Sequence, residues 1–571
     1  MGTTTMNIMS GFRHTARTSA VAHLAMIALA LSAAALPARA EVRLPNIFGD
    51  HMVLQREKPV GVWGWAEPGE KVTVRFAGQA KPAVADDKGN WSVKLDAIEA
   101  SADGRELLVE AASGKVALAD VLVGEVWLCG GQSNMEWTLR STRDADVEMP
   151  CANYPAVRFI RLPHVARLEP QTDFPVEGPK RPEGNWRLCT TQQVDNCTGV
   201  GYYFGRRLHR HLGVPVGLID TSWGGTMAQH WVSKDTLRKF PEVKPYFDKF
   251  EGRLKAWIDG GREEGAKRRY EADLKAWEKQ RAEAKAKGER EPRKPNVNAY
   301  QNPADKGQPG GMFNGMIAPL AGLAIRGVLF YQGENNSFTV GWKPFPKTFP
   351  AVIADWRKAF ADEGLPFGII QIAGWSNRRS MTYDMNHHTN IVREVQFLTW
   401  RRAANTGLIV TFDTNSTQGI HPRRKLPVGE RAARWALAEV YNVKRWGTDQ
   451  PLEWRGPVYK AMAVEEGKII ITFEEGTNRG LVLDQDVESG FYVAGKDREF
   501  HHARARILKN PDRLQVWSDD VPEPVAVRYG WSNLPMGGLM NSRELPAYPF
   551  RTDAWPLVPH QSTGEYVVDG K

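Results

Sequence analysis

Hydrophobic and polar positions alternate in the first and last parts of the chain. From residue 41 to about 117, runs with a period of two, such as 60–65 and 71–76, are separated by Pro, Gly and Asp. The alternation returns from about residue 450, for example in 468–473 and 514–517. Such runs predict antiparallel strands that bury one face. We therefore expect a small β-sandwich at the start of the chain and a second β-domain at its end.

The middle of the chain has a different pattern. Near-continuous apolar runs occupy 121–131, 214–225, 324–334, 367–374 and 406–413. Stretches with helical spacing of apolar residues lie between them, at 200–212, 349–363 and 425–441. Strands buried on both faces and alternating with helices predict an α/β domain with a parallel sheet. Its functional side chains are expected just past the carboxyl ends of the strands.

A charged segment interrupts this α/β pattern. Between residues 251 and 294, apolar residues recur at helical spacing on both sides of Gly260-Gly261, which predicts a helical hairpin with solvated outer faces. We expect an insertion packed on the α/β domain, with a partner-binding coiled coil as the alternative. The expected organisation is a signal peptide (1–40), a β-sandwich (41–117), an α/β catalytic domain in two parts (118–250 and 298–448), the helical insert (251–297) and a C-terminal β-domain (449–571).

The N-terminus has the pattern of a secretory signal. Basic residues including Arg13 and Arg17 precede an Ala-rich apolar run, and Ala38-Arg39-Ala40 has the small residues that signal peptidase requires. Cleavage there would release a periplasmic or secreted protein without a membrane anchor; a retained N-terminal anchor is the alternative. Removing 1–40 takes away three arginines and no acid, so the formal charge falls from +9 to +6.

Composition narrows the function classes. With 42% hydrophobic residues, the chain can form real cores, which excludes a disordered protein. A small positive charge spread over 571 residues indicates no nucleic-acid partner. The 20 tryptophans exceed the 14 tyrosines, and indole rings can stack on sugars; the candidates near strand ends are Trp137, Trp223, Trp231 and Trp375. Four cysteines allow three pairings, with Cys189 and Cys197 the easiest to join, and none has zinc-site spacing.

Candidate chemistry gathers at four strand ends. Ser133 follows the first buried run, Ser222-Trp223-Gly224-Gly225 the second and Gly333-Glu334-Asn335-Asn336 the third, while His421 follows the last. Each has an ordinary structural explanation: a helix cap, a turn, a buried amide and a loop histidine. Together they provide a nucleophile, two oxyanion donors and a base at one edge of a sheet, which is what acyl transfer requires.

These segments also carry a family resemblance. GEVWLCGGQSNMEW (124–137), SWGGTMAQHW (222–231), YQGENN (331–336) and GIHP (419–422) resemble the four blocks of SGNH hydrolases, specifically the sialate O-acetylesterase family of carbohydrate esterases. The segment RLPNIFGDHMVLQREKPVGVWGWAEPGE (43–70) resembles that family's N-terminal β-domain. The resemblance implies a three-layer SGNH domain flanked by β-sandwich-like domains. It also implies hydrolysis of O-acetyl esters on a sugar or glycan, with no metal and no other cofactor.

The resemblance assigns roles to single residues. Ser133 matches the nucleophile and His421 the general base. Gly225 and Asn336 match the oxyanion donors, with the N–H of Ser133 as the third. The implied reaction passes through an acetyl-serine intermediate. Further substrate contacts are expected from Gln132, Asn134, Trp223, Glu334 and Arg393, and Arg140 is another candidate for a sialate carboxylate.

One position departs from the SGNH pattern. SGNH hydrolases place an Asp three residues before the histidine to orient its ring, and this chain has Gln418 there. The site is therefore a Ser–His dyad, or another group orients the ring. The candidates are Asp413, Glu334, Gln418 and a backbone carbonyl.

The substrate and the reaction class leave alternatives. Sialate is the family's namesake substrate, and acetylated plant polysaccharide is equally compatible with an exported enzyme. A non-catalytic glycan-binding protein would keep the aromatic residues without needing Ser133 and His421. A lipase or peptidase is a further alternative, although no Gly-x-Ser-x-Gly elbow surrounds Ser133.

Overall fold

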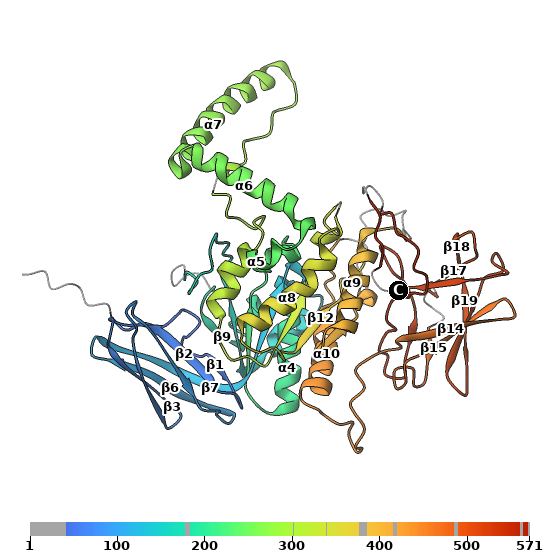
Figure 1. The fold of residues 1–571 in the computed structure, drawn as a ribbon, viewed down its shortest axis with the longest axis horizontal. Helices are drawn as coiled ribbons and strands as arrows, with labels where there is room; N and C mark the ends of the chain where they lie inside the picture. Colours follow the sequence, from blue (N-terminus) through green and yellow to red (C-terminus); the bar gives the residue numbers. More distant parts are fainter. Residues whose placement is uncertain are drawn as a thin grey trace, which may run out of the picture.

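The computed structural model describes residues 41–571 apart from 177–182, 301, 339, 376–384, 415–418, 485–488, 560–563 and 569–571. The expected signal peptide and Gln418 lie outside the described residues. In the part that is described, none of the helices combines the length and hydrophobicity needed to cross a membrane. The chain forms a row of three parts, with N-terminal strands, a central α/β body and C-terminal strands (Figure 1).

The N-terminal part consists of short strands joined by tight turns. Its strands are β1 (Val53–Gln55), β2 (Val60–Trp65), β3 (Lys71–Phe76), β4 (Gln79–Val84), β5 (Asn90–Leu95), β6 (Ser101–Ala111) and the first half of β7 (Gly114–Gly131). Alternate side chains of β3 and β5 are buried, as the period of two predicts. The expected boundary between residues 117 and 118 falls inside β7, since this strand pairs with β6 at its start and enters the central sheet at its end.

The central sheet has the strand order β13-β12-β11-β7-β10-β8-β9. Besides β7, its strands are β8 (Asn153–Arg161), β9 (Trp186–Thr190), β10 (Val216–Asp220), β11 (Gly327–Tyr331), β12 (Phe367–Ile370) and β13 (Thr406–Ile409). All neighbours are parallel except β8 and β9, so the expectation of an α/β domain with a mainly parallel sheet is confirmed. In chain order, the strands on one side of β7 (β8, β9 and β10) come first, and those on its other side (β11, β12 and β13) follow. This switch of direction opens a crevice at the carboxyl end of β7, where ligands bind in such sheets.

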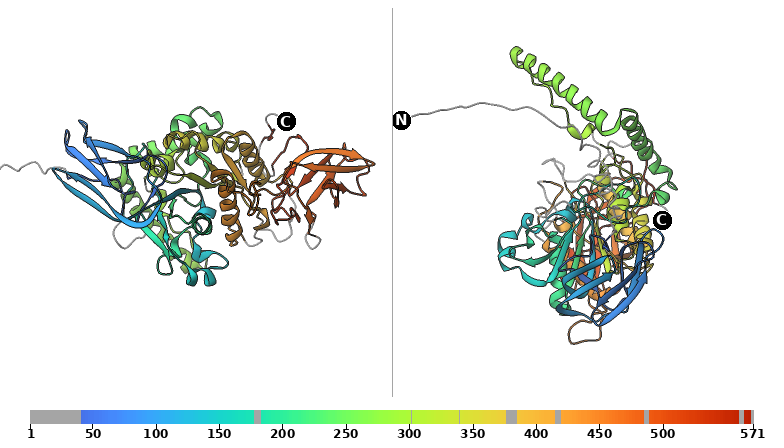
Figure 2. Two further views of the ribbon diagram at one scale, coloured as in Figure 1. Left: turned by 90° about the horizontal axis from the view of Figure 1, so that it is seen from below. Right: turned by 90° about the vertical axis from the view of Figure 1, so that its left-hand side faces the viewer.

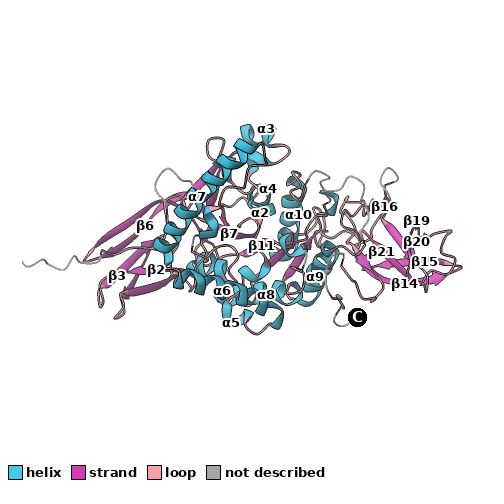
Figure 3. Cartoon of the chain, turned by 90° about the horizontal axis from the view of Figure 1, so that it is seen from above, coloured by secondary structure: helices cyan, strands magenta, loops and turns pink. Residues whose placement is uncertain are grey.

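Helices cover both faces of the sheet. On one face lie α4 (Gly199–Leu212) and α10 (Leu426–Trp435), and on the other α8 (Phe345–Ala359) and α9 (His388–Arg402), as Figure 3 shows. Glycines allow the close approach of bulky rings. A Cβ on Gly130 would lie 2.6 Å from the Trp356 ring of α8, and one on Gly407 would lie 2.2 Å from the Trp435 ring of α10.

The charged segment forms two helices, α6 (Lys244–Asp259) and α7 (Arg262–Lys287). Both project away from the body (Figures 1 and 2). Phe247 and Phe250 of α6 are buried, whereas α7 buries only Gly265, Ala266 and Ala284. Phe247 and Phe250 precede the expected insert (251–297). The expected packing of the insert on the α/β domain is wrong for α7, which buries too few side chains for such packing.

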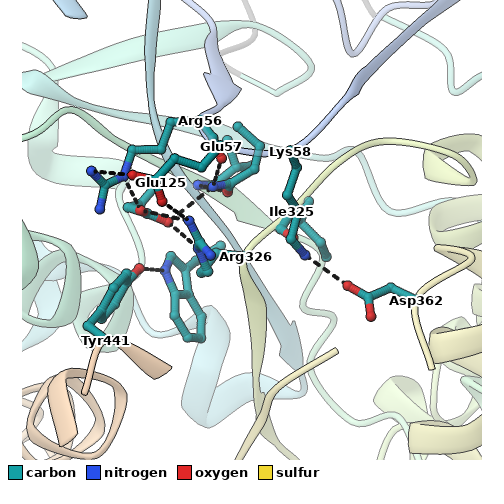
Figure 4. Close-up of polar contacts among 11 residues, drawn as sticks. Arg56, Glu57, Lys58, Glu125, Ile325, Arg326, Asp362 and Tyr441 are labelled. Carbon is teal, nitrogen blue, oxygen red and sulfur yellow. Dashed lines mark hydrogen bonds and ion pairs between the residues drawn. The ribbon is translucent and has the colours of Figure 1, made fainter. Parts of the chain in front are cut away.

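A buried carboxylate joins the N-terminal part to the body (Figure 4). Glu125 of β7 is fully buried and accepts hydrogen bonds from Arg56 at 2.5 Å and Arg326 at 2.7 Å. Burial alone would raise the pKa of Glu125, but the bonds from Arg326 and Arg56 hold it below its ordinary value. Lys58 adds a second link through its 2.8 Å ion pair with Asp362.

The C-terminal part contains two antiparallel four-stranded sheets. Their strands are β14 (Tyr459–Glu465), β15 (Lys468–Phe473), β20 (Arg513–Trp517) and β19 (Arg504–Leu508) in one, and β18 (Phe500–His502), β17 (Phe491–Ala494), β21 (Ala526–Tyr529) and β23 (Phe550–Arg551) in the other. Arg551 forms a buried bidentate pair with Glu394 of α9, with both distances 3.0 Å. This pair fixes the C-terminal strands against the α/β body.

The four cysteines are free thiols. Cys189 and Cys197 are both buried. Burial raises the pKa of Cys197, and Cys189 raises it further, so the two thiols are neighbours. The structure thus brings together the pair that was expected to be the easiest to join, without a bond between them.

Candidate active site

Ser133 is held at the carboxyl end of β7 by a tight turn. Gly131 has φ +126°, and a Cβ there would lie 2.1 Å from the carbonyl oxygen of Tyr331 in β11, so only glycine fits. The N–H of Gln132 donates to that same carbonyl at 3.0 Å. The short helix α2 (Ser133–Glu136) then begins with Ser133 at its first position. The half-buried hydroxyl of Ser133 therefore lies in the crevice that the strand order creates.

His421 contacts this hydroxyl directly. Its Nε2 lies 2.7 Å from Oγ of Ser133, which is hydrogen-bond distance for a nucleophile and its base. The indole of Trp137 stacks on the imidazole, with ring centres 5.0 Å apart and an interplanar angle of 26°. Burial lowers the pKa of His421, Lys425 lowers it further, and Glu136 acts in the opposite direction. The ring is therefore neutral near pH 7 and can accept a proton.

Asp413 does not complete a triad. Its carboxylate forms a bidentate pair with Arg431, at 2.7 and 2.6 Å, and both oxygens are thereby engaged. Among the hydrogen bonds of the described residues, none joins Asp413 to His421, and Nδ1 of His421 has no partner. The expectation that Asp413 orients the ring is not supported, because the arginine of α10 holds the carboxylate instead.

Two backbone N–H groups next to Ser133 are available to a ligand. Gly225 has φ +76°, and in the described part of the chain neither its N–H nor that of Ser133 has an acceptor. The N–H of Gly224 instead donates to Glu136 at 2.7 Å. A Cβ on Gly224 would lie 3.2 Å from Cβ of Ser133, so the glycine loop passes directly beside this serine.

Asn336, the expected side-chain donor to the oxyanion, points into the protein, and the preceding residue Asn335 lies beside the glycine loop instead. The side chain of Asn336 is fully buried, with Oδ1 accepting from the N–H of Ala228 and Nδ2 donating to Gln229 and Gly341. Its amide is therefore fully used inside the protein. Asn335 is half-buried instead, and its Nδ2 donates to the carbonyl of Gly225 at 2.7 Å, leaving a second N–H on the same nitrogen. Asn335 is the amide beside the glycine loop.

Three polar residues expected to touch substrate are buried behind the site. Gln132, Asn134 and Glu334 are at most 2% exposed. Oε1 of Gln132 accepts from Gln332 at 2.7 Å, and Oε1 of Glu334 accepts from Asn134 at 2.5 Å. These expectations are wrong, because the side chains point into the protein and connect its loops.

Arg393 is also misplaced as a substrate contact. It is 2% exposed on α9 and donates to Asn390 at 2.5 Å and to the carbonyl of Ser532. It lines a cavity of about 140 Å³ between α9 and the C-terminal strands, together with Phe397 and Trp531. Arg393 therefore belongs to the contact between these parts, and not to the surroundings of Ser133.

The four tryptophans expected near strand ends differ in their exposure to solvent. Trp137 and Trp223 are partly exposed beside the Ser133 turn, and Trp223 stacks flat on His164 at 4.7 Å. Trp231 is wrong as a sugar platform, since it is fully buried against α8. Trp375 is half-buried and faces Phe338 at 5.5 Å.

An open groove of about 680 Å³ lies next to the Trp137 side of the site. Arg140, Arg143 and Arg423 line it together with Thr142 and Asp146. Arg143 is paired with Asp144, and Arg140 lies 3.6 Å from Asp195. Arg423, two residues beyond His421, donates only to backbone carbonyls of Ser141 and Thr142 among the described residues. Its charge is therefore available to an anionic ligand.

The sequence interpretation overlooked several residues of this site. Glu136 accepts from Arg161 at 2.7 Å and from the N–H of Gly224, and Lys425 donates to Asn134 at 2.5 Å. Their positions in the sequence could have indicated both residues. Glu136 is an acid three residues after the candidate nucleophile, and Lys425 begins a helix just after the candidate base. Among the described residues, no group of three or more His, Cys, Asp or Glu is arranged to hold a metal ion.

Comparison with known proteins shows to which family the chain belongs. No protein-family model matches it. Mouse sialate O-acetylesterase is 26% identical over 561 residues, covering 89% of this chain and 94% of the mouse protein. Human sialate O-acetylesterase is 27% identical over 445 residues, covering 72% and 73%. The crystal structure of a carbohydrate acetylesterase from Xanthomonas citri superposes with a TM-score of 0.70 at 30% identity, covering 90% of this chain and all of that one. The chain therefore belongs to the sialate O-acetylesterase family of carbohydrate esterases.

Proposed function

We propose that this protein is a serine esterase that removes O-acetyl groups from sugars through an acetyl-serine intermediate. The observation that carries the proposal is the 2.7 Å contact between His421 Nε2 and Ser133 Oγ, beside the N–H of Gly225, which has no acceptor in the described part of the chain. Nucleophile, base and oxyanion donor meet at the carboxyl end of β7. The family relatives, which are named as esterases of sialate or carbohydrate, support the same reaction class.

The proposed mechanism follows from the positions of these groups. His421 accepts the proton of Ser133 while Oγ attacks the acetyl carbonyl. The N–H groups of Ser133 and Gly225 and the free N–H of Asn335 stabilise the oxyanion, with Asn335 taking the role expected of Asn336. The imidazolium protonates the sugar oxygen as the C–O bond breaks. Water, deprotonated by His421, then attacks the acetyl-serine, and acetate leaves as Ser133 regains its proton.

Export and domain division complete the proposal. We propose that cleavage after Ala40 releases the protein to the periplasm or the exterior, and that an SGNH-type catalytic domain lies between the two β-rich parts, with the helical pair as its insert. Arg423 lines the groove and has no carboxylate partner among the described residues, so its guanidinium favours acidic acetylated sugars over neutral ones.

The substrate class is tested by measuring acetate release. The wild-type protein is incubated with O-acetylated sialosides, acetylated pectic fragments and acetylated xylo-oligosaccharides at equal acetyl concentration. We expect acetate from all three, with the larger kcat/KM on the two acidic classes. Glycan binding without acetate release would contradict the esterase, and a preference for xylo-oligosaccharides would contradict only the role of Arg423.

The pH dependence tests the role of His421. Since burial and then Lys425 lower its pKa below the ordinary 6.5, we expect kcat/KM to be constant near pH 7 and to fall with a midpoint below 6.5 as the ring becomes protonated. Replacing Glu136 by Gln keeps an acceptor for Gly224 and removes the charge that raises this pKa, so the midpoint should move to lower pH. A wild-type midpoint above 7 would contradict the assignment of the base.

A further inference from the structure

One side chain, Asn134, joins three segments of the site. This residue directly follows the proposed nucleophile and is fully buried. Its Oδ1 accepts a hydrogen bond from Lys425 at 2.5 Å, and its Nδ2 donates to Glu334 at 2.5 Å and to the carbonyl of Ile420 at 3.0 Å. The three partners come from the start of α10, the loop after β11 and the loop that carries His421. All the hydrogen-bonding atoms of this amide are used within the protein.

The contacts of Asn134 hold the His421 loop at both ends. Ile420 immediately precedes the histidine, and Lys425 follows it by four residues at the N-cap of α10. Both are fixed to the same amide, which is itself one residue from Ser133. The separation of Ser133 and His421 is therefore set through a single rigid side chain. In a triad, the orienting carboxylate performs this positioning from the other side of the ring.

The two hydrogen-bond partners of Asn134 that carry a charge, Lys425 and Glu334, are both buried. Lys425 is 1% exposed and Glu334 is 1% exposed, so each loses its hydration. Lys425 contacts Asn134, and its Nζ lies 5.3 Å from the ring centre of Tyr331. Burial lowers the pKa of Lys425 and raises that of Glu334, and each charge opposes the shift of the other. Oε2 of Glu334 is buried and has no partner among the described residues, so Asn134 and the lysine charge are what compensates this carboxylate.

We infer that Lys425, Asn134 and Glu334 form a positioning network that holds His421 against Ser133, in place of the carboxylate that a Ser–His–Asp triad would use. The inference rests on the proposed function, because it concerns the same base. None of the three touches the reacting atoms; each acts through the histidine loop. Among the described residues, the charged groups that act on the pKa of His421 are Lys425, at the N-cap of α10, and Glu136 of α2, and they act in opposite directions.

The main test uses Lys425→Met and the isosteric Glu334→Gln. Lys425→Met removes the positive charge that lowers the pKa of His421, and Glu334→Gln removes the carboxylate that faces this lysine across Asn134. For both variants we expect kcat on an acetylated sugar to fall at least tenfold, with KM within twofold. For Lys425→Met we also expect the acidic midpoint of the pH profile to rise. Asn134→Ala should lower kcat by about a hundredfold, since small displacements of a catalytic group have effects of that size.

Lys58→Met is the matched control. Lys58 also forms an ion pair, with Asp362, at the junction with the N-terminal part. Its loss should lower the melting temperature without moving the pH profile. If Lys425→Met and Glu334→Gln are folded by circular dichroism and keep the wild-type kcat and midpoint, the inference is wrong. If Lys425→Met does not fold, Glu334→Gln decides alone. Absence of acetate release by the wild type would instead reject the proposed function.

Discussion

Replacing Ser133 by alanine is expected to lower kcat for acetate release by about 10⁴-fold or more. The change removes the oxygen that His421 Nε2 contacts at 2.7 Å, and with it the attacking atom of the proposed acylation step. The N–H groups of Ser133 and Gly225 stay in place, so substrate binding should persist and KM should change little. The measurement is kcat and KM for acetate release, together with mass spectrometry of the wild-type protein after treatment with a phosphonate that labels reactive serines.

A nearby serine provides the control. Ser141→Ala removes a hydroxyl whose described side-chain contact is a weak one of 3.4 Å with Thr138, and it leaves the backbone carbonyl that Trp137 uses. This variant should keep wild-type activity and phosphonate labelling. Full activity in Ser133→Ala, or labelling at another residue of the wild type, would mean that Ser133 is not the nucleophile.

The strand ends of the catalytic part could be predicted from the sequence. The run 121–131 coincides with the buried second half of β7, and the run 324–334 contains the whole of β11, because parallel strands covered on both faces need continuous apolar residues. Since the carboxyl ends of such strands lie at one edge of the sheet, the proximity of Ser133 and His421 could be predicted from the sequence alone. The strands β8 and β9 were not predicted, because the first half of β8 is partly exposed and the edge strand β9 is only partly buried, so neither has a continuous apolar run.

The direction of polar side chains could not be predicted in the same way. Asn134 and Glu334 stand in the most distinctive segments of the chain, yet both point into the protein. Some polar loop residues face a ligand and others hold a neighbouring loop, and sequence periodicity does not distinguish these cases in irregular backbone. Arg393 is a similar case, because its partner Ser532 comes from the loop after β21, 139 positions later in the chain.

The choice between two neighbouring amides shows the same limit and can be tested. In YQGENN, the family resemblance assigns the oxyanion donor to Asn336, and the preceding Asn335 has the same side-chain amide. A single turn of 3₁₀-helix over Asn335–Ser337 turns their side chains in different directions. Asn336 goes inward to Ala228, Gln229 and Gly341, while Asn335 reaches the carbonyl of Gly225.

Asn335→Ala and Asn336→Ala should therefore fail in different ways. Loss of one oxyanion donor lowers kcat by about 10² to 10³-fold, so we expect that effect for Asn335→Ala, with KM and melting temperature nearly unchanged. Asn336→Ala leaves buried polar groups of Ala228, Gln229 and Gly341 without partners, which should cost about 1–3 kcal/mol of unfolding free energy. Its kcat per folded molecule should stay within tenfold of the wild type.

The measurements are kcat normalised by phosphonate titration and urea unfolding for each variant. If Asn336→Ala is stable but loses kcat while Asn335→Ala keeps it, the donor is Asn336. The 2.7 Å bond from Asn335 to Gly225 would then only shape the loop.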